Sequence, residues 1–271
     1  MGYYRVMKSK HAHSLSVVYA VYNEASNIAR SLESIQDLAD EIIVVDGSSS
    51  DGTAEIAKKY GARIIETTNK PIFHINKQMA MEAAKGEWTL QMDADEVVDT
   101  PMAKDILRIV NTVDDTQLDV GYWLKRKNWF LGRFLTKGGQ YPDPVIRFYK
   151  TGKARLPMKS VHEQMKVDGS VGWLDGHLLH YNSPTFADYL RKANTYTSLT
   201  AGEMKRDKVA LGFGSALRWI VWLSVKTFFL LYFRHKGFMD GMAGFVFALF
   251  SGLHFPLAYL KYWELERTPR I

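Results

Sequence analysis

The chain has no cysteine among its 271 residues. This excludes a disulfide framework, a thiolate zinc site and a thiol nucleophile, so any metal would have to bind to carboxylates or histidines. The first 18 residues are basic, and they contain no apolar run as long as that of a signal peptide. We therefore expect a chain that is not exported and a site that faces the cytosol.

The formal charge of +6 is spread unevenly along the chain. Residues 121–160 carry ten lysines and arginines and one acid, whereas residues 81–119 carry ten acids and three bases. Such blocks can be ordinary solvated surface. Because aromatic residues such as Trp123 and Trp129 interrupt the basic block, it favours a surface for phosphates or anionic lipid headgroups. No nucleic-acid-binding motif is present, and we expect no nucleic-acid partner.

The first hundred residues alternate between strand and helix patterns. Short apolar runs rich in β-branched residues predict buried strands at residues 14–21, 41–46, 62–66 and 87–93. Amphipathic segments between them predict helices at residues 26–38, 53–60 and 75–84. This alternation predicts a Rossmann-like α/β fold with a mostly parallel sheet and flanking helices. Such sheets bind ligands beyond the carboxyl ends of their strands.

The rest of the chain differs in pattern. Shorter strand candidates and a polar helix continue the domain through residues 121–207, and the last 60 residues or so are strongly apolar. Residues 214–237 include Arg218 and Lys226, and residues 241–260 include Pro256. A spanning helix needs about 20 apolar residues, so we expect a helical hairpin that lies in or on the membrane through residues 214–260. A buried helix pair is the alternative.

Two carboxylates lie where the fourth predicted strand ends. Asp93 and Asp95 flank Ala94, and on a continuing strand both side chains would point to one face. That spacing suits a divalent hard cation, Mn²⁺ or Mg²⁺, that bridges the protein to a diphosphate. The metal would assist departure of a nucleoside diphosphate as a Lewis acid. Many such pairs are merely solvated turns, and the position after a buried strand is what favours a site.

A second acidic motif, DGSSSDGT, ends the second predicted strand at Asp46. Its glycines allow a tight backbone path, and Ser50 and Asp51 can cap the next helix. An ordinary helix cap would explain those two residues. It explains Asp46 less well, because an acid at the end of a buried strand needs a partner.

The motifs VYNEASNI, DGSSSDGT and GEWTLQMDADE occur in this order within residues 14–98. Together they resemble the amino-terminal half of family 2 glycosyltransferases, which have the GT-A fold. The family usually has proline where this chain has Ala20 or Val21, a minor departure. Residues 147–165 and 178–198 resemble lipopolysaccharide-core and other cell-surface glucosyltransferase-like members.

The resemblance implies a role for several residues in the first half. Asp46 would bind the base, Asp93 the ribose or diphosphate, and Asp95 the metal. The remaining nucleotide-sugar contacts that it implies are Ala20, Val21, Tyr22, Glu24, Lys77 and Ala94. We expect a GT-A catalytic domain at residues 1–210, with a nucleotide-sugar-binding half at 14–98 and an acceptor half at 121–207, and, from the apolar composition, membrane-associating helices at residues 211–271.

An inverting transfer needs a carboxylate that takes the proton from the acceptor hydroxyl. We expect Glu163 to be this base, because it lies in a region poor in acids where surrounding bases would hold it ionised. Asp143 is the competing candidate. Related enzymes often bring a histidine to the metal or diphosphate where this chain has His180, although a histidine at a strand end can also be structural.

Several cations could pair with phosphates of the donor or the acceptor. These are Arg147, Arg191 and Lys192, and each could equally be a surface charge.

The sequence thus predicts an inverting, metal-assisted hexosyltransferase at the cytoplasmic side of the cell membrane. The donor would be a nucleoside-diphosphate sugar, a UDP-sugar, and the acceptor a lipid-linked or cell-envelope glycan. The rival hypotheses are a nucleotidyltransferase and a non-catalytic membrane-associated scaffold. A nucleotidyltransferase would want a Gly-rich phosphate loop after the first strand, where this chain reads YNEAS.

Overall fold

The computed structural model describes residues 11–70, 72–114, 116, 118–157 and 164–267, and the chain divides into two compact units. The first unit comprises residues 1–126 and 143–180, and the second comprises residues 127–142 and 181–271. The chain passes from one unit to the other within two of its strands, β6 (Gly121–Phe130) and β12 (Leu178–Ser183).

The first unit begins with alternating strands and helices, as the sequence predicts. The strands are β1 (Leu15–Val21), β2 (Glu41–Asp46), β3 (Arg63–Glu66) and β4 (Trp88–Met92), and the helices are α1 (Ile28–Ile35), α2 (Thr53–Lys59) and α3 (His74–Glu82). Strand β1 pairs in parallel with both β2 and β4, and β2 pairs in parallel with β3. The predicted α/β class and the parallel sheet of the amino-terminal half are confirmed.

The strands added later introduce antiparallel pairings. They are β5 (Glu96–Val98), β8 (Asp143–Lys150), β6 and β12, and the full order is β3-β2-β1-β4-β8-β6-β12-β5. Strand β8 is antiparallel to both β4 and β6, and β12 is antiparallel to β5. The sheet as a whole is therefore mixed, because the described residues between 121 and 183 form hairpin-like returns and no crossover helix. Shorter strands complete the set: β7 (Arg133–Phe134), β9 (Ala154–Arg155), β10 (Lys166–Val167) and β11 (Val171–Trp173).

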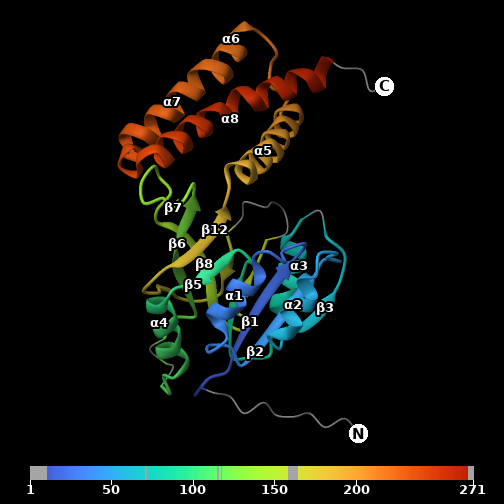
Figure 1. Ribbon diagram of the computed structural model, residues 1–271, viewed down its shortest axis with the longest axis vertical. Helices are drawn as coiled ribbons and strands as arrows, with labels where there is room; N and C mark the ends of the chain where they lie inside the picture. The colour runs from blue at the N-terminus through green and yellow to red at the C-terminus, as the bar shows by residue number, and fades with distance from the viewer. Residues whose placement is uncertain (1–10, 71, 115, 117, 158–163, 268–271) are drawn as a thin grey trace. The chain divides into compact units, whose positions relative to one another are not determined.

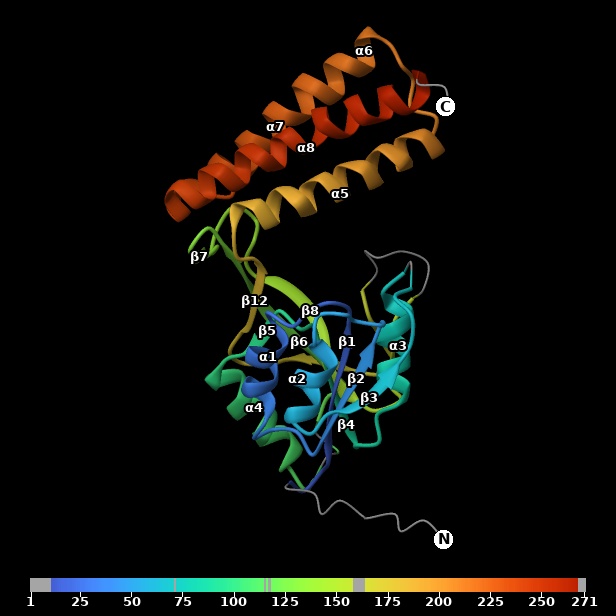
Figure 2. The same cartoon turned by 45° about the vertical axis from the view of Figure 1, so that its right-hand side comes forward.

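Strand alternation divides the core of this unit between the two faces of the sheet. Leu15, Val17 and Tyr19 point toward one face, which α1, α2 and α4 (Thr100–Val110) cover. Val18 points to the other face, where Ala80 of α3 packs. Figure 1 shows these helices beside the strands, and Figure 2 shows α1 and α2 on one side of β1 and α3 on the other. With both faces covered, the carboxyl-end edge of the parallel strands is left for a ligand.

The second unit is mainly helical. It contains α5 (Phe186–Arg206), a helical segment over Phe213–Arg234, and α8 (Gly241–Arg267). The middle segment consists of α6 (Phe213–Ala216), a π-helical stretch (Leu217–Trp222), α7 (Leu223–Phe229) and a second π-helical stretch (Leu230–Arg234). A short 3₁₀ turn (Gly237–Asp240) leads into α8. The predicted helical hairpin is confirmed.

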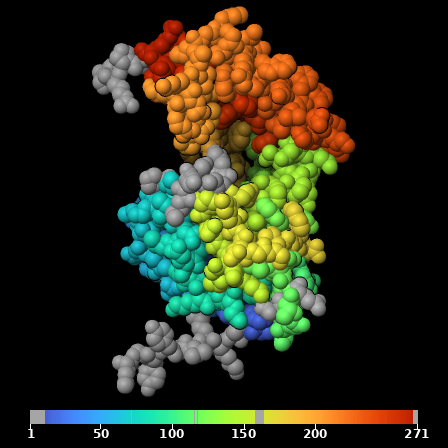
Figure 3. Space-filling view, turned by 180° about the vertical axis from the view of Figure 1, so that it is seen from behind, coloured from blue at the N-terminus to red at the C-terminus, as the bar shows by residue number. Residues whose placement is uncertain are grey.

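By length and composition, both arms of this hairpin could cross a membrane. Few of their large apolar side chains are covered, and Trp222, Phe229 and Phe233 are more than half exposed. Figure 3 shows side chains of these helices in orange and red on the surface of their unit. Helix α5 packs on α8 through Ala201, Met204 and Tyr259. It therefore belongs with the hairpin in the second unit, whereas the predicted domain boundary at residue 210 assigns it to the catalytic domain. That boundary stays a prediction.

One glycine holds the start of α4 in place. Asp99 caps this helix by accepting a hydrogen bond from the Met102 amide (3.0 Å), and it also accepts one from the His177 amide (2.9 Å). Gly176 has a φ of +78°, and a Cβ there would collide with the Met102 nitrogen and the Asp99 carboxylate. No other residue type fits this turn without displacing the cap.

We expect Gly176→Ala to lower the free energy of unfolding by about 2–4 kcal/mol, because left-handed strain adds to a lost cap. Gly61→Ala is the matched control: φ is +79° there, and nothing lies within 4 Å of the added Cβ. It should cost only about 1–2 kcal/mol, the left-handed strain alone. Urea unfolding followed by tryptophan fluorescence measures both, and equal losses would contradict the proposed collision.

Candidate active site

The turn between β4 and β5 carries the acidic motif. Strand β4 ends at Met92, Asp93 to Asp95 form the turn, and β5 begins at Glu96. The Asp93 amide donates to Glu96 Oε2 (3.0 Å), and the Glu96 amide donates to the Asp93 carbonyl (3.0 Å). The side chain of Ala94 is buried and packs in the hydrophobic core beneath the turn. These bonds fix the directions in which the two aspartates point.

Asp93 lies between two buried cations. Its Oδ1 is 2.5 Å from Lys77 Nζ on α3, and its Oδ2 is 2.8 Å from Arg147 Nη2 on β8. Gln91 Nε2 also donates to Oδ1 (3.2 Å), and the Gln91 Oε1 accepts from Arg147 Nη1. Arg147 reaches Asp93 because β8 pairs directly with β4. The structure thus brings three predicted donor-site residues together, and Arg147 is not a surface charge.

Glu96 connects this group to a second one. Its side chain is fully buried, and Oε1 lies 3.4 Å from Arg126 Nη1 and 3.7 Å from Arg147 Nη2. Arg126 also donates two hydrogen bonds to Asp143 Oδ2, from Nε (3.0 Å) and Nη2 (2.7 Å). The candidate base Asp143 is therefore already held by an arginine.

Burial and charge oppose each other in this network. Burial raises the pKa of Asp93, but the charges of Arg147 and Lys77 outweigh that effect and hold the pKa well below its ordinary value. Burial lowers the pKa of Lys77, and the Asp93 charge offsets only part of that shift. Burial also lowers the pKa of Arg147, but the negative charges of Asp93 and Glu96 raise it by more than burial lowers it. The pKa of Arg147 is therefore above its ordinary value. Asp93 therefore stays ionised at neutral pH.

Asp95 points to a different partner. Its Oδ2 lies 3.5 Å from His180 Nε2, because β12 pairs with β5 and places His180 opposite Glu96. One carboxylate and one imidazole suit Mn²⁺ or Mg²⁺ only if other oxygens complete the shell. No group of three or more Asp, Glu or His side chains gathers around a metal position in the described part of the chain. The donor set fits a metal whose remaining ligands come from a bound diphosphate and water.

The loops after β1 and β2 are tied to each other. The Ser50 amide donates to Asn23 Oδ1 (2.9 Å), the Asn23 amide donates to Ser49 Oγ (2.9 Å), and the Gly47 amide donates to the Val21 carbonyl (2.9 Å). Asn23 and Ser48 have positive φ values of 54° and 68°, a strained backbone that persists where surrounding contacts fix it.

The predicted donor residues in these loops differ in how they are held. Asp46 is buried, and its oxygens accept from the Ser49 amide (2.9 Å) and hydroxyl (2.5 Å), so its partner is local. Glu24 accepts from the Asn27 side chain (2.8 Å), and Tyr22 is 46% exposed at the edge of the sheet. Ala20 is half-buried near the end of β1. The first-choice base, Glu163, lies outside the described residues.

Sequence reasoning missed three members of the network: Gln91, Glu96 and Arg126. Gln91 is an amide side chain inside the buried and mostly apolar strand WTLQM, and this was a usable signal. Glu96 directly follows the acidic pair. The sequence gives no such signal for Arg126, because residues 121–160 contain ten arginines and lysines. Arg126 lies beside Asp143 because β6 pairs with β8.

The ion pairs of Asp93 should make stability depend on pH in a defined way. Its folded pKa is depressed, so the contribution is complete above the unfolded value near 3.9 and is lost as pH falls below about 4. We expect Asp93→Asn to cost about 3–5 kcal/mol at pH 7, because two buried cations lose a partner. This difference from the wild type should shrink as pH falls from 4 to 3.

Urea unfolding at pH 7, 5, 4 and 3 measures the effect. Asp37→Asn, which changes an exposed carboxylate in the same unit, should follow the wild type at every pH. A difference for Asp93→Asn that is the same at all four pH values would be inconsistent with the ion pairs.

Comparison with known proteins bears on this site. Residues 16–164 match the model of glycosyl transferase family 2. The lipopolysaccharide core biosynthesis glycosyltransferase LpsC of Rhizobium meliloti is 26% identical over 95% of this chain and 96% of its own length. An uncharacterized glycosyltransferase of Rickettsia typhi is 29% identical over 88% of this chain and 85% of its own.

Two solved structures are similar at lower identity. The mannosyltransferase PcManGT of Pyrobaculum calidifontis, in complex with GDP-Man and Mn²⁺, has a TM-score of 0.47 at 15% identity and covers 96% of this chain. The chain spans 77% of that protein and 46% of S. aureus TarS, which has a TM-score of 0.48 at 19% identity and covers 84% of this chain. The family match covers more than half of the chain, and the nucleotidyltransferase and scaffold alternatives are set aside. The chain belongs to glycosyl transferase family 2 and is a glycosyltransferase with a GT-A fold.

Proposed function

We propose that this glycosyltransferase transfers a sugar, with inversion, from a UDP-sugar to a lipid-linked or cell-envelope glycan. The observation that carries the donor half is the pair Asp95–His180 beside the buried network of Asp93, Lys77 and Arg147. Asp93 and Asp95 follow the carboxyl end of the parallel strand β4, and α/β sheets bind nucleotides at such strand ends. Asp93, held ionised and fixed, can accept hydrogen bonds from ribose hydroxyls.

Asp95 and His180 would hold a divalent metal, Mn²⁺ or Mg²⁺, together with the donor diphosphate. The bound metal supplies Lewis-acid neutralisation of charge on the departing diphosphate. Asp93 contributes to the metal site only indirectly, because both of its oxygens contact cations. This revises the expectation that Asp93 and Asp95 bind the metal side by side.

In the proposed reaction the acceptor hydroxyl oxygen forms a bond to the anomeric carbon as the bond from that carbon to the diphosphate breaks. The electron pair of the broken bond leaves with UDP, and the hydroxyl proton passes to a carboxylate. Glu163 remains our choice for that base. Asp143 is less suited, because one of its oxygens already accepts two hydrogen bonds from Arg126 and is therefore occupied.

The acceptor class rests on two supports. LpsC, which is similar along nearly the whole chain, is named for lipopolysaccharide core biosynthesis. The helical unit also exposes large apolar side chains on two arms that are long enough to meet a bilayer. An enzyme held at the cytoplasmic face of the membrane through residues 214–260 would meet amphiphilic acceptors without a separate capture step.

We expect Asp95→Ala to abolish the metal-dependent part of UDP binding while the protein stays folded. The reason is that the aspartate supplies the charged ligand of the pair with His180. The readout is the thermal shift of the protein with UDP, with and without Mn²⁺, and a ligand at 100 times its dissociation constant adds about 2.7 kcal/mol to stability. Asp37→Ala is the control. An unchanged Mn²⁺-dependent shift in Asp95→Ala would remove the metal assignment.

We expect Glu163→Gln to spare donor binding and to lower the rate of transfer by about 10²–10⁴-fold, the usual contribution of a general base. Asp143→Asn should reduce the rate less and should also lower stability, since it leaves Arg126 with one carboxylate fewer. Release of UDP in the presence of acceptor measures the rate, and UDP affinity is measured in parallel. Retained turnover in Glu163→Gln would move the base to Asp143.

A further inference from the structure

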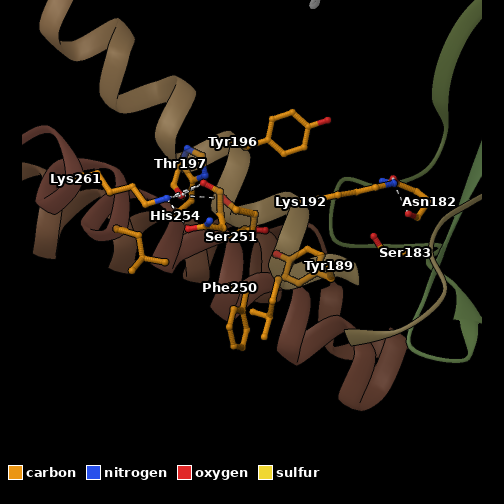
Figure 4. A pocket seen from close by; sticks show the side chains of 14 residues that line it. Asn182, Ser183, Tyr189, Lys192, Tyr196, Thr197, Phe250, Ser251, His254 and Lys261 are labelled. Atoms are coloured by element: carbon orange, nitrogen blue, oxygen red, sulfur yellow. Dashed lines mark hydrogen bonds between the residues drawn. The ribbon is translucent and has the colours of Figure 1, made fainter. Parts of the chain in front are cut away.

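A groove runs along the helical unit between α5 and α8 (Figure 4). It encloses about 460 Å³. One wall comes from α8, where Phe250, Leu257 and Lys261 recur at helical spacing and so share a face. The other wall comes from α5, where Tyr189, Ala193 and Tyr196 share a face in the same way. The proposed transfer chemistry uses none of these residues.

The middle of the groove is apolar and open. Leu190 and Leu257 are 42% and 47% exposed. Phe250 packs edge-on against Tyr189, with ring centroids 6.0 Å apart. Apolar surface that stays accessible in a concave site marks a place for an apolar ligand group.

A lysine from α8 lies at one end of the groove. Lys261 Nζ contacts four oxygens of α5: the Asn194 carbonyl (2.6 Å) and Oδ1 (2.8 Å), Thr197 Oγ1 (2.7 Å) and Ser198 Oγ (2.8 Å). Figure 4 shows it reaching across toward Thr197. These partners are all neutral. They orient the ammonium, and none of these four oxygens carries a negative charge that would balance it.

A second lysine lies toward the other end. Lys192 Nζ is 2.5 Å from both the carbonyl and the Oδ1 of Asn182, again neutral oxygens. Neither Lys192 nor Lys261 forms an ion pair with a carboxylate of the described chain, whereas Lys205 on the same helix as Lys192 pairs with Glu266 (3.0 Å). The groove thus combines an open apolar floor with two oriented cations.

We infer that this groove binds the phosphate-bearing head and adjoining acyl chain of an anionic lipid. The inference rests on the proposed membrane association. The lysines supply attraction to the phosphate, and the groove's hydroxyl and amide groups can donate to its oxygens. Leu190, Leu257 and Phe250 supply the apolar contact that a free phosphate would not need. The groove therefore recognises a lipid by both of its parts.

The test uses the full chain and dihexanoyl phosphatidylglycerol, a short-chain lipid that stays monomeric in dilute solution, with affinity measured by calorimetry. We expect the double variant Lys192→Gln/Lys261→Gln to bind it about tenfold more weakly or worse, because each lysine near an anionic lipid adds attraction. Arg206→Gln/Lys208→Gln is the matched control. It removes two exposed cations of the same unit outside the groove and should bind as the wild type does.

A second variant leaves both lysines in place. Leu257→Glu puts a carboxylate one helical turn before Lys261 on α8, a spacing that stabilises a helix. The new carboxylate would pair with Lys261 and repel a phosphate, so we expect a similar loss of affinity in a folded protein. Circular dichroism checks the fold.

Equal affinity in the wild type and the groove variants, or equal loss in the groove variant and the matched control, would overturn the inference. Inorganic phosphate that binds as tightly as the lipid, with the same dependence on Lys261, would also overturn it in favour of a free-phosphate site. Flotation with neutral phosphatidylcholine vesicles tests membrane association separately. A protein that binds the short-chain lipid but not vesicles would refute only the membrane proposal.

Discussion

Charge balance around the buried carboxylate of Glu96 and the partly buried carboxylate of Asp93 is the constraint on which the rest of the catalytic unit depends. Three carboxylates and three cations meet there: Asp93, Glu96, Asp143, Lys77, Arg126 and Arg147. A buried charge that loses its partner is strongly destabilising, so the elements that carry these six side chains must all be in position together. The antiparallel additions to the sheet meet this need, because β8 lies beside β4 and β6 lies beside β8. The order of the strands therefore also determines which charged side chains meet in the site.

Much of the donor half could be predicted from the sequence. Each of the first four predicted strands overlaps an observed one, since alternating buried runs and Gly-rich turns are local signals. The predicted residues Asp93, Lys77 and Arg147 meet at one point. What could not be predicted depends on pairing between strands far apart in sequence. The choice of Arg126 among many basic residues, and the turning of Asp93 toward cations while Asp95 faces His180, follow from β6–β8 and β5–β12 pairing.

The sequence also did not indicate that α5 packs with the helical hairpin. The sequence of α5 is polar, and its pattern fits a solvated helix of the catalytic domain. Small and flexible side chains such as Ala201 and Met204 make its contact with Tyr259 of α8, and such residues give little hydrophobic signal. Composition marks the apolar hairpin clearly, but it does not show which polar helix packs beside it.

The π-helical stretches of the hairpin have a consequence for how its first arm presents charge. Arg218, Lys226 and Arg234 follow one another at intervals of eight residues, and all three are exposed. In a regular α-helix eight residues overshoot two turns by about 80°, so the three cations would wind around the helix. Each wider π turn takes up an extra residue and reduces that overshoot. The change in helical phase brings the three cations toward one side of the arm, where exposed apolar side chains such as Trp222 and Phe229 lie among them.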